Sequence, residues 1–393
     1  MPRLKILLIA VGGLVVAGVV GTRFARPAGS ASGAGAVCRR VAAAERTACY
    51  SRLLSERLGA HGVADAVATL DAFAAADPDV AEHAHEYAHG IGIEAYGRSP
   101  EITATFAACG DGYSSGCRHG VIQAYFESRD HVAAPEVEAL CKPFKSATAS
   151  RWVLFQCVHG MGHGLTMFHA HDLPRALADC DLLTDGWDRE SCYGGAFMES
   201  VINATSPHHP ATQLAMQGHH HQTAAAFKAL DPDDPLYPCS IMAERYLHAC
   251  YQMQTSVMLH FNHGDIAAAA GSCDRAPLQV RSVCYQSLGR DITSYALRDP
   301  QKSADLCAKG TAAYRPACYF GAAKALVDWT ATTDAAFTFC RIVAREPGGP
   351  TCYQALGEEI ATLVATTPER EEQCTRAQDP AAVAACRQGA GLR

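Results

Sequence analysis

The chain has 393 residues, of which 49% are hydrophobic and 19% are charged. This composition is typical of a folded protein with a sizeable core, and it excludes an intrinsically disordered chain. The net charge is −7, and no run of lysine and arginine follows the first few dozen residues. Because a surface that binds nucleic acid must be basic to neutralise phosphates, DNA and RNA are excluded as expected partners.

Residues 1–36 have the pattern of an export signal. Arg3 and Lys5 precede an apolar run of 16 residues, from Ile6 to Gly21. As a helix this run is about 24 Å long, somewhat less than the roughly 30 Å hydrocarbon core of a membrane. The length fits a signal peptide or a short signal anchor. We expect an uncleaved anchor and a Gly/Ala/Ser linker that tether the chain to a membrane, facing the periplasm or the extracellular space. The alternative is a cleaved signal and a secreted protein.

The 18 cysteines support export independently. They form nine close pairs: Cys38 with Cys49, Cys109 with Cys117, Cys141 with Cys157, Cys180 with Cys192, Cys239 with Cys250, Cys273 with Cys284, Cys307 with Cys318, Cys340 with Cys352 and Cys374 with Cys386. This pattern indicates a disulfide within each pair, which persists in an oxidising compartment. Zinc–thiolate sites are disfavoured, because every cysteine already has a neighbour to bridge.

The cysteine spacing reveals a sequence repeat. In the last five pairs, the first cysteines lie 34, 34, 33 and 34 residues apart, and in six of the nine pairs the second cysteine is followed by tyrosine. A period near 34 residues is typical of a helix-turn-helix repeat, and the chain resembles tetratricopeptide arrays in this period only. We therefore expect repeated αα-hairpins.

The unit around Cys307 and Cys318 shows how such a hairpin forms. Gly310 is a usual stop for the first helix, and Pro316 suits the first turn of the second. The two cysteines then face each other across the turn, and a disulfide there stabilises the hairpin by roughly 2–3 kcal/mol. With one cysteine-free hairpin around Tyr87, about ten hairpins are expected. The predicted fold is an all-α solenoid or closed toroid.

The repeats are not all alike. Residues 37–205 carry histidine-rich repeats, residues 206–238 form an insertion, and residues 239–393 form regular, structural repeats. The insertion contains five histidines, His208, His209, His219, His220 and His221. Such a loop is equally consistent with metal capture, with gating of a concave face, or with soluble filler, and these readings remain open.

Five histidines of the first region are the candidate metal ligands: His85, His89, His119, His159 and His163. Three of them precede glycine at equivalent repeat positions, and a solenoid aligns equivalent positions on one face. Two pairs are four residues apart, so each pair projects from one face of a helix. Imidazole binds Zn, Cu and Fe well, so the pattern predicts a transition-metal centre, possible in a metal-dependent oxidoreductase or hydrolase. All five can share one centre only if the array is sharply curved; otherwise His119 joins one pair, or two sites exist.

Two other functions are compatible with the sequence. The stretch from His85 to His89 matches HExxH, which makes Glu86 a candidate general base of a zinc peptidase. Glu199 is the second candidate catalytic carboxylate. However, zinc peptidases of this type present substrate along a strand, and no strand is expected. The other alternative is a metal-free scaffold whose concave face binds a protein or peptide.

Overall fold

The computed structural model describes residues 35–146, 150–205 and 227–392, and these residues contain helices and no strand. In the first half the helices are α2 (Ala43–His61), α3 (Val63–Ala76), α4 (Pro78–Glu82), α5 (Ala84–Arg98), α6 (Ile102–Ala108), α7 (Gly116–Glu127), α8 (Ala134–Leu140), α9 (Arg151–Phe168), α10 (Leu173–Cys180) and α11 (Gly186–Thr205). In the second half they are α13 (Leu247–Phe261), α14 (Ile266–Cys273), α15 (Leu278–Tyr295), α16 (Pro300–Cys307), α17 (Arg315–Asp328), α18 (Asp334–Val343), α19 (Gly349–Leu363), α20 (Thr367–Thr375) and α21 (Pro380–Gly389).

Most hairpins pair a short first helix with a longer second helix. The first helices begin where the sequence supplies a cap: the side chains of Asp265, Asp299 and Asp379 each accept a backbone N–H in the first turn. Proline stands in the first turn of α16 and α17, where its missing N–H has no helical partner to lose. These local signals set the start of the helices that carry them.

The nine cysteine pairs are disulfides between neighbours in sequence, as the spacing predicts. Cys307 ends α16 and Cys318 lies in the first turn of α17, so their bridge closes the turn between the two helices. All the cysteines except Cys49, which is partly buried, are almost fully buried in the same continuous core as the inward side chains. Nine disulfides are consistent with an oxidising, exported environment.

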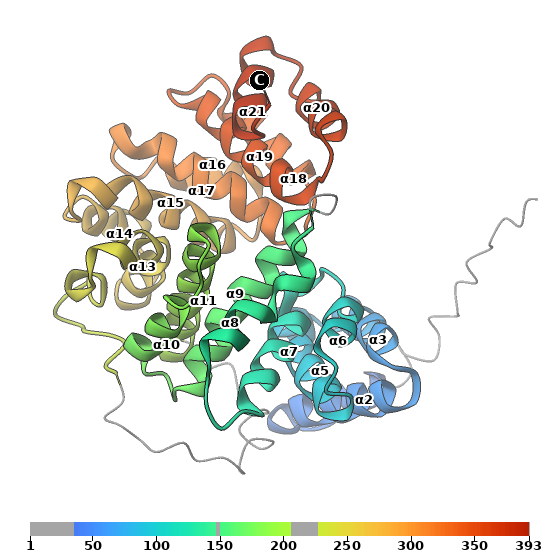
Figure 1. The fold of residues 1–393 in the computed structure, drawn as a ribbon. Coiled ribbons are helices and arrows are strands. Elements are labelled where there is room, and N and C mark those ends of the chain that lie inside the picture. The colour runs from blue at the N-terminus through green and yellow to red at the C-terminus, as the bar shows by residue number, and fades with distance from the viewer. Residues whose placement is uncertain (1–34, 147–149, 206–226, 393) are drawn as a thin grey trace, which may run out of the picture.

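The second helices of consecutive hairpins pack side by side and curve into a ring. From α9 the order of contacts runs through α11, α13, α15 and α17 to α19, and α19 then contacts α9 again. Figure 1 shows α18 and α19 beside the upper end of α9, although nearly 200 residues separate the two segments in sequence. The curvature therefore closes six inner helices around a common centre, while α5 and α7 continue the array beyond α9.

Close helix packing depends on paired glycines. A Cβ on Gly92 would overlap the carbonyl oxygen of Cys117, and a Cβ on Gly120 would overlap that of His89, so α5 and α7 touch through their backbones. Gly162 and Gly195 make the equivalent contact between α9 and α11. These four glycines thus bring neighbouring helices together, and with them the histidines that these helices carry.

Two expected features lie outside the described residues. These are most of the N-terminal segment, whose first 34 residues are not described, and residues 206–226, which hold all five histidines of the insertion. Among the helices that are described, none combines the length and the apolar character needed to span a lipid bilayer.

Candidate metal centre

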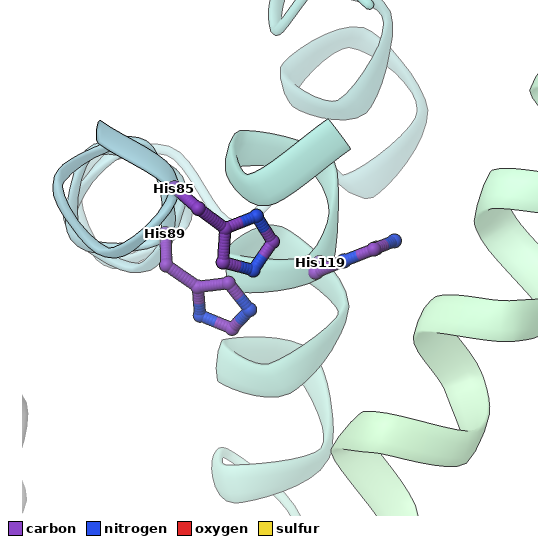
Figure 2. A group of neighbouring side chains, drawn as sticks. All are labelled: His85, His89 and His119. Atoms are coloured by element: carbon purple, nitrogen blue, oxygen red, sulfur yellow. The ribbon is translucent and has the colours of Figure 1, made fainter. Parts of the chain in front are cut away.

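Three histidines from two adjacent helices converge on one small volume. His85 and His89 lie one turn apart on α5, and His119 lies on α7, which packs against α5. One ring nitrogen from each lies within 4.8 Å of the others. The ring centroids are 5.5 Å apart for His85 and His89, 6.0 Å for His85 and His119, and 6.1 Å for His89 and His119. Figure 2 shows His85 and His89 projecting from α5 toward α7, with His119 projecting from α7 on their far side.

The burial of this group suits a bound ion more than a surface cluster. His89 is 2% exposed and His119 is 4% exposed, whereas His85 is partly exposed. The His119 pKa lies well below its usual value, because burial and then the four neighbouring histidines disfavour the charged ring. A neutral imidazole is the form that binds metal, so His119 needs no proton removed before it binds an ion.

Hydrogen bonds fix which nitrogens of two rings face the centre. Nδ1 of His85 lies 2.7 Å from the carbonyl oxygen of Tyr113. Since a carbonyl only accepts, Nδ1 carries the proton and Nε2 is left to bind a metal. Tyr113 itself is held by its hydroxyl, which donates to Asp71 at 2.6 Å. This second layer of contacts orients His85 in the manner common around metal ligands.

His119 is oriented from the opposite side. Its Nε2 lies 3.2 Å from Oε1 of Gln156, so Nε2 donates and Nδ1 keeps its lone pair. Nδ1 is buried and has no hydrogen-bond partner among the described residues. A buried acceptor without a partner is costly, and a metal ion in the centre would satisfy it. The residues present therefore fit a metal ion.

The other two candidate ligands, His159 and His163 on α9, extend the cluster. The His119 ring lies 5.7 Å from His159 and stacks 4.9 Å from His163, and the two α9 rings are 5.0 Å apart. All five imidazoles therefore form one contiguous group with His119 at its centre. The array is curved enough to gather them, but the set whose ligand atoms converge consists of His85, His89 and His119.

The two α9 histidines differ in their surroundings. Nδ1 of His163 lies 2.9 Å from Oε2 of Glu199, and its Nε2 is buried with no partner among the described residues. His159 instead borders the cavity enclosed by the ring of helices. Its pKa is lowered to about 3, chiefly by burial and also by the neighbouring His163. His159 therefore connects the histidine cluster to the cavity as a neutral ring.

The structure separates the two candidate catalytic carboxylates. Glu199 pairs with His163 inside the cluster. Glu86 accepts a hydrogen bond from Nδ1 of His83 at 3.2 Å, and the His83 side chain is 52% exposed. Glu86 follows His85 on the helix, so it projects about 100° away from it. No carboxylate belongs to the converging ligand set found among the described residues.

Comparison of the chain with models of known families, with curated proteins and with solved structures finds no match.

A second group of polar residues lines the central cavity and was not expected from the sequence. All six ring helices border this cavity of about 290 Å³, and its charged residues include Arg290, Lys324, Asp328 and Glu359. Their positions follow the repeat: Arg290 and Lys324 lie six residues after the second cysteine of their hairpins, as His163 does, and Glu359 lies seven residues after, as Glu199 does. Aligning the repeats on that cysteine would have identified this polar face.

Proposed function

We infer that the chain is an exported, membrane-tethered helical-repeat protein that binds one transition-metal ion through His85, His89 and His119. The observation that carries this proposal is the convergence of three imidazole nitrogens within 4.8 Å of one another, with two of the three rings almost fully buried. Isolated buried imidazoles normally have hydrogen-bond partners for both nitrogens. Here the buried Nδ1 of His119 has none among the described residues.

The donor set narrows the metal to Zn²⁺, Cu²⁺ or Fe²⁺, because three neutral nitrogen ligands suit these ions and not Mg²⁺ or Ca²⁺. Three protein ligands also leave a coordination position open, which is the arrangement of catalytic zinc sites. When bound there, such an ion polarises a substrate or acidifies a water molecule.

Around the ion, the chain supplies orientation and shielding. The Tyr113 carbonyl and the Gln156 amide hold the rings of His85 and His119, and close contact of α5 with α7 keeps the two helices from separating. Disulfides remove thiols that would otherwise compete for a soft metal. The proposal that the chain is exported rests on its N-terminal apolar segment and on its nine disulfides.

The proposal is tested by measuring metal in untagged full-length protein by mass spectrometry, before and after dialysis against Zn²⁺. We expect about one ion per chain in the native protein, and loss of that ion in His89→Ala and in His119→Ala. His260→Ala is the matched control, because His260 is an exposed histidine on α13 outside the cluster. His159→Ala and His163→Ala should weaken binding less than the first two variants.

A wild-type protein that binds no metal even after dialysis would contradict the proposal and leave the array as a scaffold for a protein or peptide. Retention of the ion in His89→Ala and His119→Ala, as in the control, would show that the ion binds elsewhere. Circular dichroism of each variant separates loss of metal from loss of fold.

A further inference from the structure

The cavity inside the helical ring is a built site of its own. Each of its six helices contributes side chains to the wall, and its volume of about 290 Å³ lies at the lower end of the range for small-molecule sites. Because the ring closes through the contact of α19 with α9, the wall is held by packed helices and not by loops. Such a wall is preorganised for a ligand.

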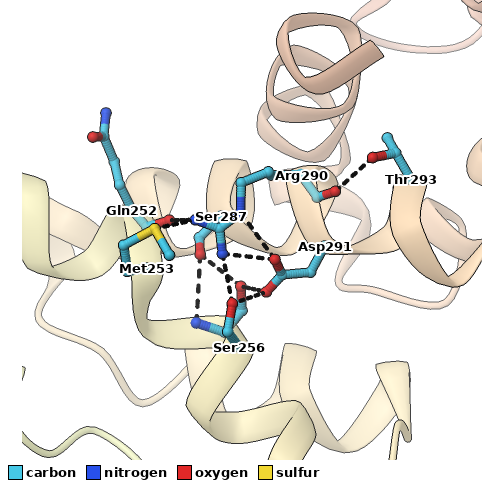
Figure 3. Close-up of polar contacts among 8 residues, drawn as sticks. Gln252, Met253, Ser256, Ser287, Arg290, Asp291 and Thr293 are labelled. Carbon is cyan, nitrogen blue, oxygen red and sulfur yellow. Dashed lines mark hydrogen bonds and ion pairs between the residues drawn. The ribbon is translucent and has the colours of Figure 1, made fainter. Parts of the chain in front are cut away.

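The cations of the cavity are already neutralised within the protein. Figure 3 shows the Arg290 guanidinium surrounded by partners from α13 and α15. It donates to Asp291 at 2.6 Å, to the Gln252 carbonyl at 2.8 Å and to Ser256 at 2.7 Å. An arginine that recognises an anionic ligand needs donors left over for it. The N–H groups of Arg290 donate to atoms of the protein itself. Arg290 therefore has no donors left to bind a phosphate or carboxylate group of a ligand.

Lys324 is neutralised in the same way. Its ammonium lies 2.9 Å from Glu359 and 3.3 Å from Glu358. Asp328 shares a hydrogen bond with Glu359, and burial together with the Glu359 charge raises the Asp328 pKa well above its usual value. Because Arg290 and Lys324 are both paired with acids of the protein, neither is left to recognise an anion, and the cavity favours an uncharged ligand.

The remaining wall combines flat apolar faces with amides. Phe155, Trp187 and Phe320 supply aromatic surface, and Phe155 and Trp187 are neighbours, with centroids 6.2 Å apart. Gln252 and Gln286 bring side-chain amides to the same space. The amide of Gln252 extends away from the Arg290 network, which it joins through its backbone (Figure 3). Amides and a carboxyl–carboxylate pair each donate and accept, which matches hydroxyl groups.

We propose that this cavity binds a neutral polyhydroxy ligand of about one sugar ring, which packs on the aromatic side chains and hydrogen-bonds to Gln252, Gln286 and the Asp328–Glu359 pair. The proposal concerns binding and not hydrolysis. The hydrogen bond between Asp328 and Glu359 places them closer than the roughly 5–9.5 Å that separates the carboxyl groups of glycoside hydrolases. The site goes beyond the metal centre and does not depend on it, although His159 borders both.

The test is titration of the full-length protein with N-acetyl-D-glucosamine and with methyl β-D-glucopyranoside, followed by calorimetry and by tryptophan fluorescence. D-glucuronate serves as the anionic comparison. We expect saturable binding of at least one neutral sugar, a change in Trp187 emission, and weaker binding of glucuronate. Gln252→Ala should weaken the neutral sugar about tenfold, the loss of a hydrogen-bonded amide. Gln301→Ala is the control, because Gln301 is an exposed glutamine on α16.

The experiment is repeated on chelator-treated protein, so that failure of the metal proposal does not affect its outcome. Persistent sugar binding without metal supports a separate site. The proposal is overturned if neither neutral sugar binds, if glucuronate binds more tightly than both, or if Gln252→Ala and Gln301→Ala behave alike. Trp187→Phe, which keeps an aromatic face, should retain binding and lose the fluorescence change.

Discussion

Nδ1 of His163 lies 2.9 Å from Oε2 of Glu199 across the contact between α9 and α11, and each side chain is 3% exposed. The same relation recurs further along the array. Ser256 donates to Asp291 at 2.9 Å, and Lys324 pairs with Glu359 at 2.9 Å. In each case a residue six positions after the second cysteine meets an acid seven positions after it on the next inner helix. His163 of the histidine cluster and the cavity-wall residues Lys324 and Glu359 therefore belong to one polar ladder.

The first prediction concerns Glu199. Replacing it with leucine leaves a buried donor of His163 without a partner, which should lower the free energy of unfolding by about 1–3 kcal/mol. Glu199→Gln keeps an acceptor oxygen of the same size and should cost less than half as much. Denaturant unfolding of the metal-free protein measures both. Equal losses in the two variants would mean that the hydrogen bond to His163 contributes nothing.

The second prediction compares two glycines on α5. A Cβ on Gly92 would overlap the backbone of Cys117, whereas a Cβ on Gly90 meets nothing within 4 Å. Gly92→Ala should therefore separate α5 from α7, destabilise the protein by roughly 1–3 kcal/mol and weaken metal binding. Gly90→Ala should be neutral or stabilising by up to about 1 kcal/mol, because alanine favours a helix. Denaturant unfolding and metal analysis of the two variants measure these effects. A similar loss of stability and of metal in both variants would contradict the close contact between α5 and α7.

The third prediction tests the hairpin bridges. Removing the Cys307–Cys318 disulfide by a double change to alanine should lower the free energy of unfolding by about 3 kcal/mol, since the bridge closes a loop of 11 residues of separation. The ring should keep its helical content, because each hairpin has its own bridge. Circular dichroism during urea unfolding measures both quantities. Global loss of structure on removing this one bridge would contradict the local role of the disulfides.

Some parts of the fold and of the metal centre can be predicted from the sequence, and others cannot. The 34-residue step from Cys273 to Cys307 predicts hairpins and local bridges, because both depend on short-range spacing. The grouping of His89 with His119 followed from their equivalent repeat positions. The contact of α19 with α9 could not be predicted in this way. The curvature of the array comes from a small rotation at every repeat, and the cysteine spacing carries no information on that rotation. Repeat alignment places Lys324 and Glu359 on one polar face, but without the ring nothing in the sequence indicates the cavity or the meeting of Asp328 with Glu359.

The fourth prediction concerns pH. The Asp328 pKa is raised above its ordinary value of 3.8 by burial and by Glu359. A group with a raised pKa in the folded state stabilises the protein fully below its unfolded pKa and loses that contribution as pH rises through the folded value. The free energy of unfolding of wild type relative to Asp328→Asn should therefore fall as pH rises above about 4. Urea unfolding of both proteins at several pH values measures this difference; a difference that rises with pH would show that Asp328 is ionised in the fold.

The central claim is that three imidazoles hold one metal ion. X-ray absorption spectroscopy of untagged, zinc-loaded protein tests it most directly, because it reports the atoms bound to the ion. The account predicts about three imidazole nitrogens at about 2.0–2.1 Å in the wild-type protein, and loss of that signal in His119→Ala with no change in His260→Ala. A shell made of oxygen or sulfur atoms, or a nitrogen shell that survives His119→Ala, would contradict it.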